Sequence, residues 1–273
     1  MSGSDPAPNG ITVRRIRFAS HSVTSGRVCG TFKHPRLCLA VEEPVAPTDV
    51  KPAAAPDELF VALAPSAAEA EGKAVERDWF PDPSAPDAVD LDTSWRGGRV
   101  RWRPGFAVVF LRGARPNEVL AALAEFAFYE GELRRLEEEM NTREAPAAED
   151  VARAYTIRRR DKDHWPRFAD TTAAFARMRL TFARLSPRLA EEPEGSRSRR
   201  LASRLLRRAR AASRAEALDT RLEACEDLYE GANDRVADHQ GWHQGHVLEI
   251  IIVALLLLEV ILLCAELVVR GGE

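Results

Sequence analysis

The chain has 273 residues, with 39 basic and 42 acidic side chains and a formal net charge of -3. This near balance argues against a protein that binds nucleic acid over its whole surface. Arg supplies 35 of the 39 basic residues, so an isolated Arg indicates little about function. Four cysteines are too sparse for a disulfide framework, and this agrees with a reducing compartment.

The first third of the chain is expected to contain β-strands. Ile11 to Ala19 alternates apolar and polar side chains, which is the pattern of a half-buried strand. Arg36 to Val41 and Glu58 to Leu63 are short apolar runs bounded by Pro, Asp and Ser. The stretch from Pro44 to Pro56 between them is expected to be a loop or linker.

The next stretch, Glu69 to Arg99, contains three prolines among many acids and is expected to be irregular and exposed. Arg96 to Val100 is expected to be a turn. Arg101 to Arg112 is the strongest predicted strand, with Pro104 and Gly105 at its start. A helix is then expected from Asn117 to about Asn141, because Asn can cap it and a helical period follows in Leu120, Leu123, Ala124, Ala127 and Glu130. Together these elements predict a mixed α/β domain over residues 1–145.

From Pro146 onward the strand signal disappears, and residues 146–246 are expected to form a helical, coiled-coil-like region. The predicted helices are Ala148 to Arg160, Arg167 to Leu185 and about Arg197 to His246, with breaks at Pro166, Pro187 and Pro193. The last helix carries a heptad seam, which is expected to require a partner helix from the same chain or another copy. The seam consists of Leu218, Leu222, Cys225, Tyr229, Ala232, Val236, His239 and His243.

Eight arginines occur between Arg197 and Arg214 without one acidic residue. A helix of this kind lies on anionic lipid, touches RNA or a ribosome, or presents a solvated face. The stretch contains no aromatic residue, which makes single-stranded nucleic acid an unlikely partner.

The most informative feature is the near-continuous apolar run from Val247 to Val269, which contains 17 Leu, Ile and Val residues. As a helix of about 1.5 Å rise per residue it would match the roughly 30 Å hydrocarbon core of a bilayer. Glu249, Glu259 and Glu266 interrupt the run, at a cost of about 2.5 to 3.5 kcal/mol for an acid at the bilayer centre. The apolar side chains outweigh this cost, so the run is expected to be a single C-terminal transmembrane helix. The alternative is a helix buried in a soluble core.

The expected orientation follows from the other end of the chain. Met1 to Gly10 is polar, without the charged and apolar regions of a secretory signal. The body is therefore expected on the cytoplasmic side of an inner or cytoplasmic membrane. The basic residues that flank the run roughly cancel.

Two constellations near the run have alternative interpretations. His239, His243 and His246, followed by Glu249, recur at helical spacing and would suit a zinc or iron site, a pH-sensitive contact between copies, or a polar membrane interface. The intramembrane acids, with Glu259 near the centre, would form a proton or cation site, or would join neighbouring spans through hydrogen bonds.

Sequence signatures of enzymes are absent: there is no phosphate-cradling loop, dinucleotide fingerprint, zinc-protease motif or nucleophile elbow. Cys29, His34 and Cys38 could share a metal, although strand cysteines are more often small core residues. No cofactor is therefore expected.

The C-terminal pattern is similar to a known family. Leu228 to Asn233 (LYEGAN), a polar stretch, and His246 to Val260 resemble the ending HxLEwIIIxLIxxEV of the proteins named for being required for meiotic nuclear division. Gly105 to Phe110 (GFAVVF) resembles that family's yGxvVfw strand. Ile250 stands where the family usually has Trp, and its Pro and Trp motif before the last helices is missing.

The resemblance implies an α+β body, a helical C-terminal region and one C-terminal span. The family includes mitochondrial inner-membrane members linked to translation, has no established enzymatic activity as a class, and suggests homo-oligomeric scaffolding. The expected function is thus a non-enzymatic, membrane-anchored scaffold or adaptor that forms homo-oligomers and recruits a protein or ribosome partner, with nucleic acid unlikely. The alternative is a metal- or proton-handling membrane protein that uses the histidines and Glu259.

Overall fold

A computed structural model describes residues 10–20, 25–50, 55, 57–80, 90–112, 115–155, 165–190 and 197–271; within its helices, the side chains of 152–155, 165, 239–247 and 262–271 are outside this description. The chain divides into two compact units that are each discontinuous in sequence. Unit 1 combines Met1–Asn141 with Met178–Arg221, and unit 2 combines Thr142–Arg177 with Leu222–Glu273. A mixed sheet and several helices confirm the α+β class that the sequence predicts.

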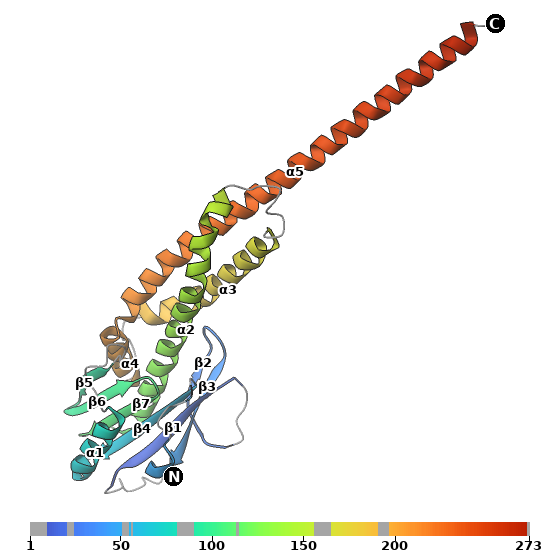
Figure 1. Cartoon of the computed structure of the whole chain (residues 1–273). Coiled ribbons are helices and arrows are strands. Elements are labelled where there is room, and N and C mark those ends of the chain that lie inside the picture. The colour runs from blue at the N-terminus through green and yellow to red at the C-terminus, as the bar shows by residue number, and fades with distance from the viewer. Residues whose placement is uncertain are drawn as a thin grey trace. The chain divides into compact units, whose positions relative to one another are not determined.

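Unit 1 contains one seven-stranded sheet with the order β2-β3-β1-β4-β7-β6-β5 (Figure 1). Neighbouring strands are antiparallel except for the central pair β4 and β7, which run parallel with Phe60 opposite Phe106. The strands are β1 (Thr12–Ala19), β2 (Arg27–Phe32), β3 (Cys38–Val45), β4 (Glu58–Pro65), β5 (Leu91–Trp95), β6 (Gly98–Arg103) and β7 (Phe106–Leu111).

Strand β4 is buried on both faces, which explains its continuous apolar run. Helix α1 (Glu69–Trp79) packs against β4 and β7 on one face. A Cβ atom at Gly72 of α1 would lie 2.7 Å from both the Ala64 Cβ and the Phe110 ring, so this close approach requires glycine. The core on this face comprises Val13, Phe60, Ala62, Phe80, Phe106 and Val108.

Helix α2 (Pro116–Tyr155) supplies the aromatic side chains for the opposite face of the sheet. Its Phe126 ring meets Trp102 of β6 edge-on at 4.8 Å between centroids. Its Phe128 ring stacks on Phe32 of β2 at 4.5 Å. Because successive side chains of a strand alternate between faces, Trp102 and the residues that pack against α1 lie on opposite sides.

The strand predicted over Arg101 to Arg112 is wrong as a single element. Two strands, β6 and β7, form a hairpin there, with Pro104 and Gly105 as the two turn residues. Gly105 has φ of 81°, and Pro followed by a residue of positive φ is typical of a type II turn. The turn expected at Arg96 to Val100 is present as the β5–β6 hairpin, where Arg96 and Gly97 both have positive φ.

Other predicted elements differ from the structure. The region predicted to be irregular, Glu69 to Arg99, contains α1 and β5, because acidic side chains on an exposed helix face do not prevent helix formation. Strand β2 was not predicted. Pro187 lies inside α3 (Trp165–Ala190), so the break predicted there is absent, and the break predicted at Pro193 falls outside the described residues. Pro146 lies inside α2, which joins two helices that were predicted separately. Pro166 is the second residue of α3, where a missing N–H is tolerated.

The long C-terminal helix begins later than predicted. Helix α4 (Arg197–Arg208) is separated from α5 (Ala211–Gly271) by a turn in which Arg210 has φ of 53°. Helix α5 then continues as one helix, so Gly231 does not break it. Two short 3-10 helices, Pro47–Asp49 and Ser66–Ala68, complete the described elements.

Unit 2 is organised around Tyr229 of α5. Its ring lies 5.7 Å from that of Phe175 and 6.0 Å from that of Phe168, both on α3. Its hydroxyl donates a hydrogen bond of 3.0 Å to Asp150 of α2, which is 2% exposed and also lies 3.4 Å from Arg167. Burial and the neighbouring Asp150 raise the pKa of the Tyr229 phenol, so it remains a donor.

The predicted heptad seam is buried within the chain over most of its length. Leu218, Leu222, Cys225, Tyr229 and Ala232 are each at most 8% exposed. Tyr229 packs against α3 of the same chain, so a second copy is not needed to cover this position. Of the remaining seam positions, Val236 is half-buried, and the His239 and His243 side chains lie outside the described residues.

Candidate functional site

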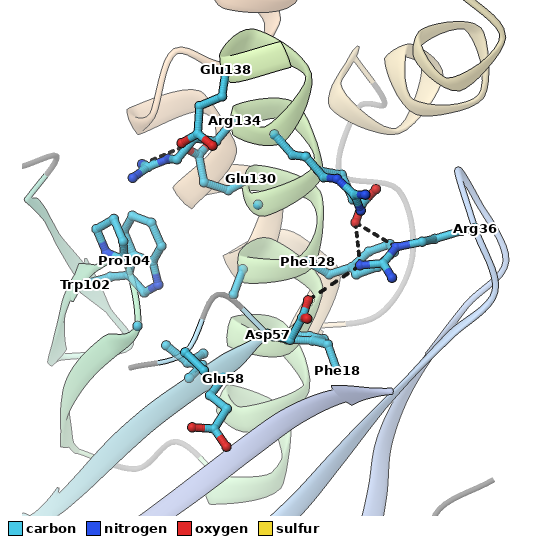
Figure 2. Close-up of a pocket in the computed structure, with 17 residues that line it drawn as sticks. Phe18, Arg36, Asp57, Glu58, Trp102, Pro104, Phe128, Glu130, Arg134 and Glu138 are labelled. Carbon is cyan, nitrogen blue, oxygen red and sulfur yellow. Dashed lines mark hydrogen bonds and ion pairs between the residues drawn. The ribbon is translucent and has the colours of Figure 1, made fainter. Parts of the chain in front are cut away.

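One pocket of unit 1 has a volume of about 520 Å³ (Figure 2). Its floor comes from the sheet, through Phe18 of β1, Leu59 of β4 and Trp102 of β6. Helix α2 forms one wall from Ala127 to Glu138. This volume is within the usual range of small-ligand sites.

Arg36 links two elements beside this pocket. Its Nε donates to Glu132 Oε1 of α2 at 2.9 Å, and an Nη lies 3.6 Å from Asp57 just before β4. Figure 2 shows the ion pair of Arg36 with Asp57. Partial burial disfavours the charged guanidinium, but the hydrogen bond and charge of Glu132, together with the nearby Cys38 and Asp57, outweigh burial and raise the pKa of Arg36. The pair therefore fixes the β2–β3 loop to α2.

A second ion-pair network includes Glu130 and Arg134 of α2, which also line the pocket. Glu130 is 1% exposed, and its carboxylate accepts hydrogen bonds from Arg214 Nη1 at 2.8 Å and from Arg134 at 3.1 Å. Arg214 also donates through Nε to Glu137 at 2.9 Å. The hydrogen bond to Glu137, followed by that to Glu130, raises the pKa of Arg214 although burial opposes this. The network joins α2 to the start of α5 within unit 1.

Trp102 lines the same pocket and has an indole N–H that takes no part in these ion pairs. The residue is 3% exposed, and its indole Nε1 has no hydrogen-bond acceptor among the described residues. A buried N–H without a partner is costly, so this wall of the pocket would favour a ligand with an acceptor atom. The lining of this pocket thus combines guanidinium–carboxylate pairs with aromatic rings.

A different candidate site is the apolar part of α5. The described residues Leu248 to Ile261 include eleven large apolar side chains, each between 48% and 61% exposed. They occupy every face of the helix, since consecutive residues are exposed. Such a surface is far more apolar than monomeric soluble proteins present to water. No helix within the described residues is long and apolar enough to span a membrane.

The structure describes the predicted site residues around α5 only in part. Glu249 and Glu259 are exposed on α5, whereas the side chains of Glu266, His239, His243 and His246 lie outside the described residues. Among the described side chains, no group of three potential ligands is placed to hold a metal ion.

Of the cysteines suggested with His34 as a metal set, Cys38 is buried in the core and Cys29 is half-buried on β2. Cys38 is fully buried on β3, and the Cys29 thiol donates to the Ala40 carbonyl at 3.5 Å. Burial raises the pKa of the Cys29 thiol to about 12 and that of Cys38 to about 11. Both are neutral thiols at neutral pH, as expected for small core side chains.

Sequence reasoning missed Arg36, Trp102 and Arg214. Only Glu130 could have been noticed in the sequence, because it occupies a position on the apolar face of the helix predicted over Asn117–Asn141. A carboxylate buried at such a position requires a cationic partner. Its partner, Arg214, is 84 residues away and cannot be identified from spacing. No family model matches the chain, and no curated protein matches it either.

Proposed function

We propose that this protein is a membrane-anchored, non-enzymatic scaffold or adaptor. The observation that carries the proposal is the exposure of Leu248 to Ile261 on every face of α5. This segment belongs to the apolar run Val247 to Val269, whose length matches a bilayer core. Burial in hydrocarbon removes the cost of exposing these side chains to water.

The proposed topology is a single pass through an inner or cytoplasmic membrane, with unit 1 and the part of unit 2 that precedes Val247 on the cytoplasmic side. The resemblance to the family required for meiotic nuclear division agrees with a C-terminal span, and we propose a divergent relationship to it. Recruitment of a protein or ribosome partner belongs to the same proposal.

Homo-oligomerisation would be driven by the span rather than by the heptad seam. Tyr229 and the seam positions before it are already buried in one chain. Glu259, by contrast, is exposed in the middle of the apolar run. Contact with a second span would remove this acidic group from lipid and supply a hydrogen-bond partner.

The same exposed Glu259 supports the second candidate function, a proton or cation path through an oligomer. Glu259→Gln keeps hydrogen bonding but cannot ionise, whereas Glu259→Leu removes both properties. A scaffold would tolerate Gln and lose oligomers with Leu. Transport through Glu259 would be lost in both variants.

Membrane extraction tests the anchor directly. The full chain is expected to stay in the membrane pellet after a carbonate wash, while a shortened chain ending at Gln240 is expected in the supernatant. This shortened chain keeps Arg214 and Tyr229, so loss of the body's packing would not explain the difference. A matched control, Leu180→Arg, changes an exposed apolar residue of α3 and should remain in the pellet. Full-length protein in the soluble fraction would contradict the proposal.

A further inference from the structure

Helix α4 presents a face of arginines to solvent, which we call the basic face. Its positions recur in steps of three and four residues, and this spacing places them on one side of a helix. The leucines that lie between them in sequence are buried in unit 1, so the helix is held by its other side. The exposed arginines of the basic face are Arg197, Arg200, Arg204, Arg207 and Arg208.

Most guanidinium groups of the basic face are not paired within the chain. Arg204 donates a hydrogen bond of 2.9 Å to the Ser94 carbonyl of β5. The other arginines of this face form no ion pair with any described residue. The basic face therefore carries positive charge that no described carboxylate balances, and it attracts an anionic surface.

Helix α5 presents a face of the opposite charge, which we call the acidic face. Its members are exposed, and steps of three, four and seven residues keep them on one side of the helix. Three pairs of them are four residues apart, where like charges destabilise a helix. None of them forms an ion pair with a described residue. The acids of this face are Glu216, Glu223, Asp227, Glu230, Asp234 and Asp238.

The two faces match in length and spacing as well as in charge. At about 1.5 Å per residue, the basic face extends over roughly 16 Å and the part of the acidic face from Glu223 to Asp238 over roughly 22 Å. Both repeat at helical spacing, so arginines of one helix can lie between carboxylates of the other over several turns. The planar guanidinium also binds carboxylate through two parallel hydrogen bonds.

A second copy of this chain is the partner that satisfies both faces. Anionic lipid or RNA would pair with the basic face of α4 and would leave the carboxylates of α5 unpaired. A foreign acidic protein would do the same. Each copy of this chain supplies both charges, so contact between copies relieves the unpaired arginines of one and the like-charge repulsion in α5 of the other.

We propose that the basic face of α4 in one copy docks on the acidic face of α5 in a second copy. This inference deepens the proposed homo-oligomerisation and rests on it, but it assigns a contact outside the apolar run. Exposed ion pairs each contribute little and are screened by salt. The contact is therefore weak, reversible and salt-dependent, and its main effect is to select another copy as the partner.

Reciprocal charge reversal in the full chain tests this contact. Sedimentation velocity in a mild detergent measures the dissociation constant between copies, with Glu259→Leu in every chain to weaken association through the span. The parent should associate at about 0.05 M NaCl, and its dissociation constant should rise about tenfold or more at about 0.5 M NaCl. Span-driven association would not respond to salt in this way.

Two double variants should each lose this association. Arg200→Glu with Arg207→Glu should raise the dissociation constant about tenfold or more, because two attractions become repulsions. Asp227→Arg with Asp234→Arg should have a similar effect. An equimolar mixture of the two variants should return to within about threefold of the parent, since α4 of the second variant then meets α5 of the first. Arg200→Gln with Arg207→Gln only removes charge and should have a smaller effect, about threefold.

The matched control is Arg77→Glu with Arg115→Glu, which makes the same charge change at exposed positions of unit 1 outside α4. Its dissociation constant should stay within about twofold of that of the parent. Equal weakening by this control would mean that net charge alone governs association, and would overturn the proposal.

Two further results would also overturn it. The first is a parent that remains monomeric at low salt up to about 0.1 mM. The second is a mixture that does not recover association although both variants keep the melting temperature of the parent, which would favour lipid or RNA as the partner of α4. All variants should stay in the membrane pellet after a carbonate wash, so failure of this contact leaves the proposed anchor intact.

Discussion

Unit 1 buries charged groups, whereas the apolar part of α5 exposes hydrophobic ones. Glu130 is 1% exposed and accepts hydrogen bonds from two arginines, so its burial is compensated within the chain. Ile261 is 61% exposed, and none of the described residues covers it. A polar group is tolerated inside when its partners are present, while an apolar surface of this extent requires a partner outside the chain.

The largest expected effect is at Arg214. Arg214→Ala should lower the free energy of unfolding by about 3 kcal/mol or more, because it leaves Glu130 buried with only Arg134 as a cationic partner. Leu256→Ala, at a residue that is 55% exposed, should change it by less than about 0.5 kcal/mol. Urea denaturation of the chain ending at Gln240 measures the first change, and the full chain in detergent measures the second.

The contrast would be broken if Arg214→Ala were as mild as Arg208→Ala, a control at an exposed position of α4. Such a result would mean that water replaces the guanidinium and that Glu130 is not truly enclosed.

A smaller effect is expected in unit 2. Tyr229→Phe keeps the ring contacts with Phe168 and Phe175 but removes the donor to Asp150. The free energy of unfolding should fall by about 1 to 2 kcal/mol, because Asp150 is 2% exposed and loses a hydrogen bond while it keeps its ion pair with Arg167. Thermal unfolding of the chain ending at Gln240 checks this, and a Tm equal to that of the parent would contradict the assigned bond.

The smallest effect concerns thiol ionisation. Burial raises the pKa of Cys29 to about 12, above the ordinary value, so the folded state favours the protonated thiol. Its contribution to stability is fully present below about pH 9 and is lost as pH rises toward 12. At pH 8, alkylation by iodoacetamide should be at least about tenfold slower in the folded than in the urea-unfolded protein. The Cys29→Ala variant shows which part of the alkylation comes from Cys29. Equal alkylation rates in the folded and unfolded protein would contradict the raised pKa.

The sequence predicted the α+β class and three strands near their observed positions. Ile11 to Ala19 and Glu58 to Leu63 have the local alternation and apolar content that also determine burial, so local reasoning was sufficient there. It failed at Arg101 to Arg112, where Pro104 and Gly105 form a turn between two strands rather than the start of one. The apolar residues on both sides of this turn made the two strands resemble one.

The candidate pocket could not be predicted in the same way. Arg36 is 96 residues from Glu132, and Glu130 is 84 residues from Arg214. Such pairs are determined by the sheet order and by the path of α2, neither of which has a local signal. The apolar run could be recognised from the sequence because its apolar residues follow one another along the chain.

The discontinuous make-up of unit 1 determines where this chain can be shortened. A chain that ends at Asn141 contains every strand and the carboxylates of Glu130 and Glu137, but it lacks Arg214. It also lacks Leu201, Leu205 and Leu206 of α4, which are buried in the complete fold. The β-sheet domain is therefore not a portable module, and work on an isolated body should retain the chain through Arg221 at least.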